Sequence, residues 1–413
     1  MSDGVRNRNN IGGSGSKSSI RSKKPDNSAF KQQRLPAWQP VLTAKSVLPI
    51  FFIVGIIFIP IGSLILVASN GVQEVEQMYT DCQAQFTFTT HPPTLADITD
   101  VSADEKSCKT IYDEWIDTFS SGTAPNGNPP TCICKQNFEI AETMNTPIFA
   151  YYRLTNYYQN HRRYVKSRDD TQLLAEKSYI STEADGDCSP YDKIGERPIA
   201  PCGAIANSLF NDTFFIRRCG DAGVECTALQ PDNIIDPTDA NGFNAIKMTG
   251  EDIAWKTDKS QKFDPNKETG NETFLSGTER PLNWRTDVHK LGTADDDLTY
   301  RHLSGSSGVG FRNEDFIVWM RTAAFPTFRK LYRKIQDNGA DLQPGNYELL
   351  TYYNYPVHRF GGGKFFVLAT TSWIGGKNLF LGWTYAIVGG ICLIVMLFLL
   401  CISRRNHNRR SIV

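Results

Sequence analysis

The cysteines are the side chains of this sequence that are best suited to covalent chemistry. Eight of the ten lie between two long apolar runs, and the other two lie within the second run. An even number of cysteines in a segment outside the cytosol favours disulfides over free thiols. No second close pair of Cys or His completes a tetrahedral metal site with Cys132 and Cys134. We expect disulfides, no metal and no cofactor, and the eight cysteines concerned are Cys82, Cys108, Cys132, Cys134, Cys188, Cys202, Cys219 and Cys226.

Catalytic signatures are weak in the rest of the sequence. Residues 361–364 (GGGK) lack the spacing and the following Ser or Thr of a phosphate-binding loop. Gly308 and Gly310 supply only half of a dinucleotide-binding fingerprint. Neither a His-Glu-x-x-His zinc motif nor a Gly-x-Ser-x-Gly elbow occurs. We therefore expect that the chain is not an enzyme.

The densest polar cluster lies at residues 160–170 (NHRRYVKSRDD). A catalytic interpretation would make His161 a base beside Asp169, but no candidate nucleophile lies nearby. Two noncatalytic interpretations stay open. In one, His161, Arg162 and Arg163 pair with acidic loops of another subunit. In the other, the cluster is a solvated loop with local ion pairs.

Two apolar runs without any Asp, Glu, Lys, Arg or His bracket the cysteine-bearing region, at residues 48–69 and 379–403. At about 1.5 Å per residue, each run is long enough to cross the roughly 30 Å hydrocarbon core of a bilayer as a helix. The first run follows a long polar tail and lacks a small-residue cleavage site, so we expect an uncleaved anchor. Because neither run holds an ionisable group, a self-sufficient ion pump or transporter is not expected.

Charge is distributed unevenly, although the formal net charge is zero. The tails, residues 1–47 and 404–413, hold 13 of the 44 basic residues and 2 of the 44 acidic ones, which leaves 31 basic and 42 acidic residues between them. Positive tails are typical of the cytosolic side, and an acidic middle disfavours nucleic acid as a partner. We expect both termini in the cytosol and residues 70–378 in the lumen or outside the cell. Sequons there predict glycans on Asn211 and Asn271.

The cytosolic segments differ in composition. Residues 1–28 are rich in Ser, Gly, Asn, Lys and Arg and predict a disordered tail. Residues 29–47 predict an ordered juxtamembrane segment, in which Phe30, Arg34 and Trp38 lie against a partner at the membrane surface. The alternative for this segment is an amphipathic stretch that faces membrane lipids.

Short segments rich in Tyr, Phe, Val and Thr, separated by turn-forming clusters, predict an antiparallel sheet or sandwich between the two runs. The predicted strands lie at residues 138–140, 148–154, 316–320, 347–355 and 365–373. A helix is predicted after Pro326, where Phe328, Leu331, Tyr332 and Ile335 have helical spacing. Residues 220–250 and 286–313 are expected to be surface insertions. The predicted fold class is two transmembrane α-helices plus a large luminal, mainly antiparallel β domain with short helices and disulfides.

Small residues in the second run suit close helix packing. Gly382, Ala386 and Gly390 recur at helical spacing, and Gly55 and Gly62 share a face of the first run. Small side chains let helix backbones approach, which is the main way in which helices associate in lipid. We expect Gly382, Ala386 and Gly390 to contact a partner helix. The alternative is that glycine is simply common in membrane helices.

Six motifs of this sequence resemble the ligand-effect-modulator family, the accessory (beta) subunits of type IV P-type ATPases, which are phospholipid flippases. The matches run in collinear order over nearly the whole folded chain. They lie at residues 30–40 (FKQQRLPAWQP), 156–167 (NYYQNHRRYVKS), 200–208 (APCGAIANS), 319–323 (WMRTA), 326–332 (PTFRKLY) and 372–378 (SWIGGKN).

The resemblance implies a two-span glycoprotein with a luminal antiparallel β sandwich, bound one to one to a ten-span ATPase that carries the catalytic residues. It implies that the chain supports the folding of the ATPase, its export from the endoplasmic reticulum and its phospholipid translocation towards the cytosolic leaflet. Residence in the endoplasmic reticulum, Golgi, endosomes or plasma membrane follows from that role. The glycan position at Asn211 also matches the family.

The resemblance further implies disulfide partners. It pairs Cys188 with Cys202, Cys82 with Cys134 and Cys108 with Cys132, although the residues alone leave the pairing of the last four open. Cys219 and Cys226 are expected to form an additional local bridge.

Two other protein classes share parts of this layout. Trimeric ligand-gated channels also have two spans, cytosolic tails and a disulfide-linked ectodomain. Their pore helices usually present a polar or acidic lining, which these runs lack. An ectoenzyme is the third class, and it lacks a catalytic constellation in this sequence.

Overall fold

The structure, a computed structural model, describes residues 27–35, 43–89, 96–101, 106–120, 129–176, 186–221, 223–224, 226–228, 244–296, 303–336, 341–357 and 360–410. The chain divides into two compact units, Met1–Ile57 with Val388–Val413, and Phe58–Ile387. Most of the predicted disordered tail, and much of the predicted insertion at residues 220–250, lie outside the described residues.

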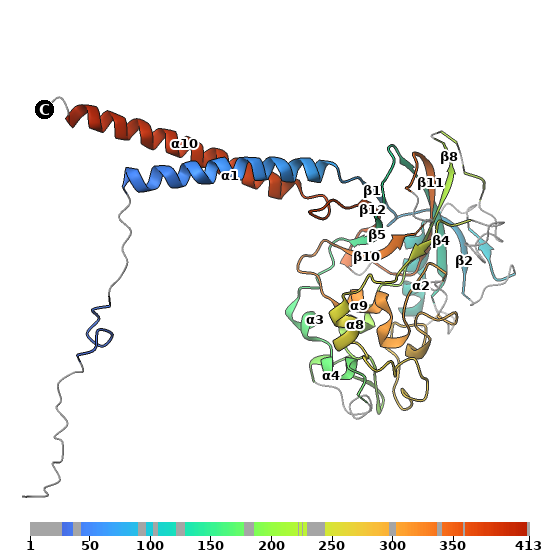
Figure 1. The fold of residues 1–413 in the computed structure, drawn as a ribbon. Coiled ribbons are helices and arrows are strands. Elements are labelled where there is room, and N and C mark those ends of the chain that lie inside the picture. The colour runs from blue at the N-terminus through green and yellow to red at the C-terminus, as the bar shows by residue number, and fades with distance from the viewer. Residues whose placement is uncertain are drawn as a thin grey trace, which may run out of the picture. The chain divides into compact units, whose positions relative to one another are not determined.

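Two long helices, α1 (Ala44–Asn70) and α10 (Leu379–Arg410), contain the predicted apolar runs (Figure 1). Their segments Ser46–Asn70 and Leu379–Arg405 are long and apolar enough to cross a membrane. Large apolar side chains on them stay exposed, for example Phe380 at 80%. Exposure of so much apolar surface is unfavourable in water, so these helices are membrane spans and not core helices of a soluble domain.

The strands that the structure describes form two five-stranded antiparallel sheets and one two-stranded sheet. The first sheet has the order β1 (Glu74–Met78), β12 (Lys364–Thr370), β5 (Ile148–Leu154), β10 (Phe328–Ile335) and β9 (Met248–Thr249). The second has the order β3 (Thr99–Asp100), β2 (Ala84–Phe88), β4 (Thr131–Ile140), β11 (Gly345–Tyr353) and β8 (Thr213–Gly220). β6 (Lys193–Ile194) pairs with β7 (Arg197–Pro198). The predicted antiparallel, sandwich-like domain is confirmed.

Short helices complete this domain, and Figure 1 shows several of them gathered beyond β5 and β10. The α-helices are α2 (Cys108–Ser120), α3 (Arg162–Lys166), α4 (Asp170–Leu173), α6 (Ala204–Asn207), α8 (Lys256–Gln261) and α9 (Glu314–Met320). The 3-10 helices are η2 (Gly186–Cys188), η3 (Val288–Lys290) and η4 (Gly310–Arg312).

Aromatic side chains fill the space between the two large sheets. Along β5, burial alternates with the two-residue period of a strand, so that Tyr152 points inward. Phe214 of β8 contacts Tyr332 of β10 and Phe366 of β12, with ring centroids 5.1 and 5.0 Å apart. Since β8 belongs to one sheet and the other two strands to the second, these rings join the two sheets.

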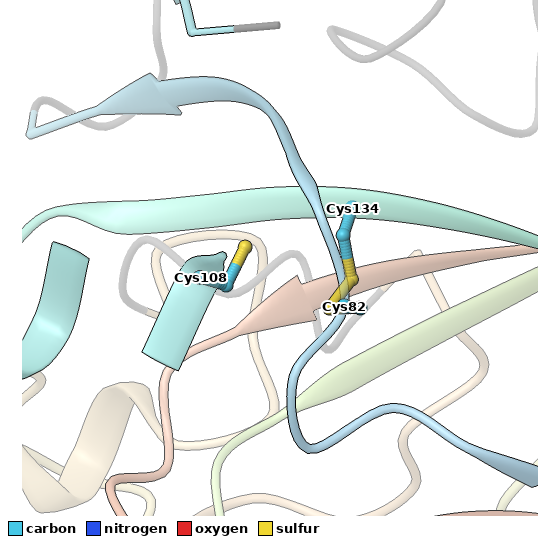
Figure 2. Close-up of side chains that lie close together, drawn as sticks. All are labelled: Cys82, Cys108 and Cys134. Atoms are coloured by element: carbon cyan, nitrogen blue, oxygen red, sulfur yellow. A yellow bond between two sulfur atoms is a disulfide. The ribbon is translucent and has the colours of Figure 1, made fainter. Parts of the chain in front are cut away.

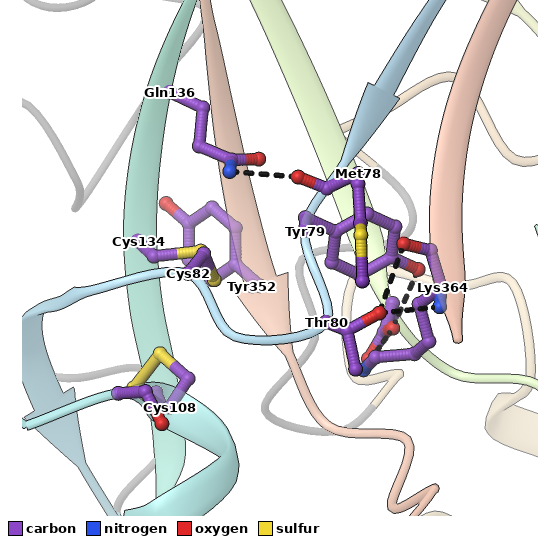
Figure 3. Close-up of a disulfide and its surroundings, with 12 residues drawn as sticks. Met78, Tyr79, Thr80, Cys82, Cys108, Cys134, Gln136, Tyr352 and Lys364 are labelled. Atoms are coloured by element: carbon purple, nitrogen blue, oxygen red, sulfur yellow. Dashed lines mark hydrogen bonds and ion pairs between the residues drawn. A yellow bond between two sulfur atoms is a disulfide. The ribbon is translucent and has the colours of Figure 1, made fainter. Parts of the chain in front are cut away.

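A fully buried ion pair also joins the sheets, and Figure 3 shows its lysine, Lys364, close to Tyr79. Lys364, the first residue of β12, donates from Nζ to Asp212 Oδ2 at 2.7 Å and to the Tyr355 carbonyl at 2.8 Å. The Tyr79 hydroxyl donates to the same carboxylate oxygen at 2.9 Å, and the backbone N–H groups of Asn354 and Tyr355 donate to Oδ1. Burial lowers the pKa of Lys364 to about 8, and the Asp212 carboxylate opposes that shift. The ammonium is therefore charged at neutral pH.

The prediction of a strand at residues 316–320 is wrong, because these residues belong to helix α9. The Asn313 side chain accepts a hydrogen bond from the Phe316 N–H at 3.1 Å, which is an N-cap, and two acidic residues occupy the first turn. A short apolar run does not distinguish a buried strand from a buried helix by its pattern alone.

The prediction of a helix after Pro326 is also wrong, because residues 328–335 form strand β10. A bulge between Leu331 and Arg333 shifts its register against β5. The bulge leaves Phe328, Tyr332 and Ile335 all buried. A strand with one extra residue thereby reproduces the i, i+4, i+7 spacing of a helix.

β10 holds α9 through two buried cations. Arg333 forms an ion pair with Asp315 in the first turn of α9. Lys330 Nζ donates to three carbonyl oxygens at the carboxyl end of the helix, where the helix dipole favours a cation. These carbonyls belong to Val318, Trp319 and Arg321.

The prediction of a surface insertion at residues 286–313 is wrong for the part that the structure describes. Val288, Leu291 and Phe311 are buried in the main core. The Gly, Ser and Asp content of this segment concealed the few apolar side chains that reach inward.

We predict that the contributions of Lys364 and Asp212 to stability depend strongly on each other. Lys364→Met leaves the Asp212 carboxylate buried without its counter-charge, and Asp212→Asn leaves the ammonium unpaired. Each change should lower the free energy of unfolding by about 3 to 5 kcal/mol. Urea denaturation of the purified chain in mild detergent, followed by intrinsic fluorescence, measures this.

The double variant should lose much less than the sum of the two single variants, because it removes both charges together. The Asn211 sequon survives Asp212→Asn, so a change in glycosylation does not confuse the comparison. Additive losses would show that the two groups are independent.

Candidate functional site

The cysteine sulfurs that could have bound a metal are used in disulfides. The Sγ atoms of Cys82, Cys108 and Cys134 lie within 4.8 Å of one another. Figure 2 shows Cys134 bonded to Cys82, with Cys108 beside them. Since metals bind thiolates, disulfide sulfurs leave no ligand set here. The structure contains the bridges that the family resemblance implies together with the additional local one, namely Cys82–Cys134, Cys108–Cys132, Cys188–Cys202 and Cys219–Cys226.

One surface of the sandwich domain combines basic and apolar side chains that are exposed, and we call it the α3 surface. It contains the three basic residues singled out in the sequence and adds four neighbours. Its members are Tyr158, His161, Arg162, Arg163, Val165, Lys166 and Phe325.

Tyr164 attaches α3 to the domain. Its hydroxyl lies 2.8 Å from Ser208 Oγ, and its ring packs edge to face on Tyr157 with centroids 6.0 Å apart. Burial raises the pKa of Tyr164 well above its ordinary value, so the phenol stays neutral. The basic residues on both sides of Tyr164 point away from this contact and into solvent.

Two side-chain to backbone hydrogen bonds bring Phe325 next to α3. Gln159 Oε1 accepts from the Ala323 N–H at 3.0 Å, and Asn160 Nδ2 donates to the Ala324 carbonyl at 2.9 Å. Phe325 follows directly and is 73% exposed. These bonds place an aromatic side chain beside the basic helix, although Phe325 belongs to a segment far away in the sequence.

The end of α3 is held by a close backbone approach. Gly203 has φ +97°, and a Cβ atom there would lie 2.1 Å from the Ser167 carbonyl oxygen. Ser167 Oγ accepts from the Ala204 N–H at 2.9 Å. Only glycine fits this position, so the segment 200–208 supports the α3 surface.

The basic side chains of the α3 surface lack acidic partners within the described residues. His161, Arg162, Arg163 and Lys166 form no ion pair there. Asp169, which a catalytic interpretation would place beside His161, instead caps α4 by accepting from two backbone N–H groups. The catalytic interpretation therefore has no support in the geometry, and the surface is suited to binding acidic groups.

Two of the three small residues of α10, Gly382 and Ala386, pack against α1 within the chain. A Cβ atom on Gly62 would lie 2.7 Å from the Ala386 backbone nitrogen and 2.8 Å from the Gly382 carbonyl oxygen. A Cβ atom on Gly382 would lie 2.7 Å from Leu66 Cγ. Close approach of α1 and α10 thus uses Gly382 and Ala386. Gly390 differs, because apart from its chain neighbours and the backbone of its own helix no described atom lies within 4 Å of where its Cβ would be.

The predicted cytosolic contact residues are only partly described. Phe30 lies in a turn and Arg34 directly follows that turn, and both are exposed. Trp38 lies outside the described residues. The sequence analysis missed Tyr158 and Phe325, and nothing in the sequence signals that their rings are exposed on the same surface as α3.

We predict that Gly62→Leu lowers the free energy of unfolding by about 1 to 3 kcal/mol, because the new side chain meets the backbone of α10. Thermal unfolding in detergent, monitored by size-exclusion chromatography of the heated sample, measures the loss. Gly390→Leu is the matched control and should leave the transition unchanged, since its Cβ enters open space. Equal shifts for the two variants would contradict this helix contact.

Comparison with known proteins matches residues 65–409 to the model of the LEM3 (ligand-effect modulator 3) family / CDC50 family. The chain is 42% identical over 394 residues to Cell cycle control protein 50A of Bos taurus, covering 94% of this chain and 91% of that protein. It is 38% identical to Cell cycle control protein 50B of Homo sapiens, covering 93% and 95%. It is 37% identical to ALA-interacting subunit 3 of Arabidopsis thaliana, covering 93% and 88%. The chain therefore belongs to the LEM3/CDC50 family, a family of accessory subunits.

Proposed function

We propose that this chain is the noncatalytic accessory subunit of a type IV P-type ATPase. Family membership supports an accessory role, and the printed name of the plant relative is that of an interacting subunit. Two membrane helices and the lack of a catalytic constellation among the described residues agree with a chain that acts by binding. The partner would carry the phosphorylated residue and the lipid path.

In this proposal, the α3 surface is the main docking site. Three basic side chains on one short helix, and the histidine at its N-cap, have no ion-pair partners in the described structure, although the region between the spans has an acidic excess. Other exposed lysines, such as Lys247 and Lys256, also form no ion pair among the described residues, so the support comes from the clustering of like charge beside exposed apolar side chains. Acidic loops of the ATPase would pair with them, and Phe325 and Tyr158 would add apolar contact at the centre.

The proposed orientation places the basic tails in the cytosol and residues 70–378 in the lumen, with glycans on Asn211 and Asn271. Phe30, Arg34 and Trp38 would touch the cytosolic side of the ATPase. Gly390 would face a helix of the ATPase, because its side of α10 is open within the chain. The complex would reside in the endoplasmic reticulum, Golgi, endosomes or plasma membrane.

The proposed mechanism is stabilisation by binding. A subunit that binds the folded ATPase and not its misfolded forms shifts the folding equilibrium and allows export from the endoplasmic reticulum. If it binds one transport intermediate more tightly than another, it also changes the populations of the cycle, by no more than that difference in affinity. Phospholipid translocation towards the cytosolic leaflet would depend on both effects.

We predict that Arg162→Glu with Arg163→Glu abolishes co-purification of the ATPase in mild detergent, with at least a tenfold loss of recovered partner. Reversal places like charges opposite the acidic loops, which costs several kcal/mol. Mass spectrometry of the large membrane protein that co-purifies with the tagged chain measures the loss and identifies the partner.

The matched control is Lys247→Glu with Lys256→Glu, which makes the same charge change at exposed lysines that do not belong to the α3 surface. It should retain the partner. Equal loss in both variants would indicate a general charge effect and contradict docking through α3. A native mass corresponding to three copies of this chain, with no second protein, would instead support the channel class.

A further inference from the structure

The two sequons lie in contrasting environments. Asn271, Glu272 and Thr273 are all exposed in a turn. The Asn271 side-chain oxygen accepts from the Thr273 N–H at 3.1 Å and from its hydroxyl at 2.8 Å. This arrangement leaves the Asn271 amide nitrogen, which is the atom that becomes glycosylated, open to solvent.

The other sequon is built into the core. Thr213 is fully buried as the first residue of β8, where it pairs with Tyr352 of β11. Its hydroxyl is buried and has no hydrogen-bond partner among the described atoms. Asp212, the middle residue, is the carboxylate of the buried ion pair with Lys364. Folding therefore hides two of the three residues of this acceptor motif.

The acceptor asparagine is itself only partly accessible. Asn211 is half-buried, and its side-chain oxygen is buried without a partner. It borders a cavity of about 20 Å³ together with Trp284 and Arg285. A cavity of that size has room for about one water molecule, so the catalytic groups of a transferase could not reach Asn211 through it. A glycan attached earlier could still project through the part of Asn211 that stays exposed.

We propose that Asn211 accepts a glycan only before the sandwich closes, whereas Asn271 remains an acceptor in the folded protein. A transferase that reads the sequon needs the hydroxyl of its third residue. That hydroxyl is accessible at Thr273 and enclosed at Thr213. The inference rests on the proposed luminal orientation and not on the ATPase partner.

The order of synthesis leaves time for the early modification. Three of the groups that enclose Asp212 lie far downstream: Asn354, Tyr355 and Lys364 follow it by 142, 143 and 152 residues. At roughly 5 to 20 residues per second, about 7 to 30 s pass before the ribosome has made them. During that interval the Asn211 sequon has no β11 or β12 to pack against. A chain that closes without the glycan would stay unmodified at Asn211.

The test uses the full-length chain made without glycans and purified in detergent. Purified oligosaccharyltransferase and a lipid-linked oligosaccharide are added to the native protein and, in parallel, to protein that was reduced and denatured. Glycopeptide mass spectrometry then gives the occupancy of each site. We expect Asn211 to be modified at least tenfold more slowly than Asn271 in the native protein, and both sites to react at similar rates after denaturation.

Variants that each remove one sequon show which asparagine carries the glycan. Thr273→Ala removes the Asn271 sequon and should leave the native protein almost unreactive, whereas Thr213→Ala should leave native modification unchanged. Equal rates at the two sites in the native protein would overturn the proposal. An unreactive Asn271 in the native protein would overturn its second half, and an unreactive Asn211 in the denatured chain would overturn its first half. Because no ATPase is present, none of these outcomes bears on partner binding.

Discussion

The Lys364 ammonium has no access to water, and the Asp212 carboxylate is the counter-charge that lets it remain charged inside the domain. Around this pair, β12 of one sheet meets the segment that enters β8 of the other. Burying a charge is costly unless it is paired and hydrogen-bonded, and here every oxygen of the carboxylate has a donor. Any packing of the two sheets that separates Lys364 from Asp212 would leave a buried charge without its partner, so the pair favours the observed arrangement.

The exposed cations of the α3 surface differ from the buried cations of the same domain. Buried cations have specific partners, as Arg333 has in Asp315 and Lys330 has in three carbonyls of α9. The basic residues of α3 have no such partners among the described residues, although Tyr164 holds their helix firmly. Such basic side chains beside exposed apolar ones are suited to binding acidic groups, which is the role that we propose for the α3 surface.

Sequence reasoning succeeded where the signal was local and failed where packing decided. Strand β5 matches its prediction from residue 148 to residue 154, because its side chains alternate without interruption. Residues 316–320 and 328–335 exchanged their predicted types. The cap at Asn313 is a local signal that the short apolar run concealed, whereas the bulge beyond Leu331 depends on pairing with β5. In the candidate site, the sequence identified His161, Arg162 and Arg163 but not Phe325, since long-range hydrogen bonds bring that ring to α3.

The sequence by itself determined the membrane helices, the excess of acid between them and the parity of the cysteines, because length, charge and count are properties of composition. The six motifs also indicated the family. Only the tertiary structure decided that Gly382 and Ala386 pack against α1 while Gly390 stays open, and that Thr213 is enclosed while Thr273 is exposed. The physical reason is that burial depends on segments more than a hundred residues apart, and spacing along the chain carries no information about which of them meet.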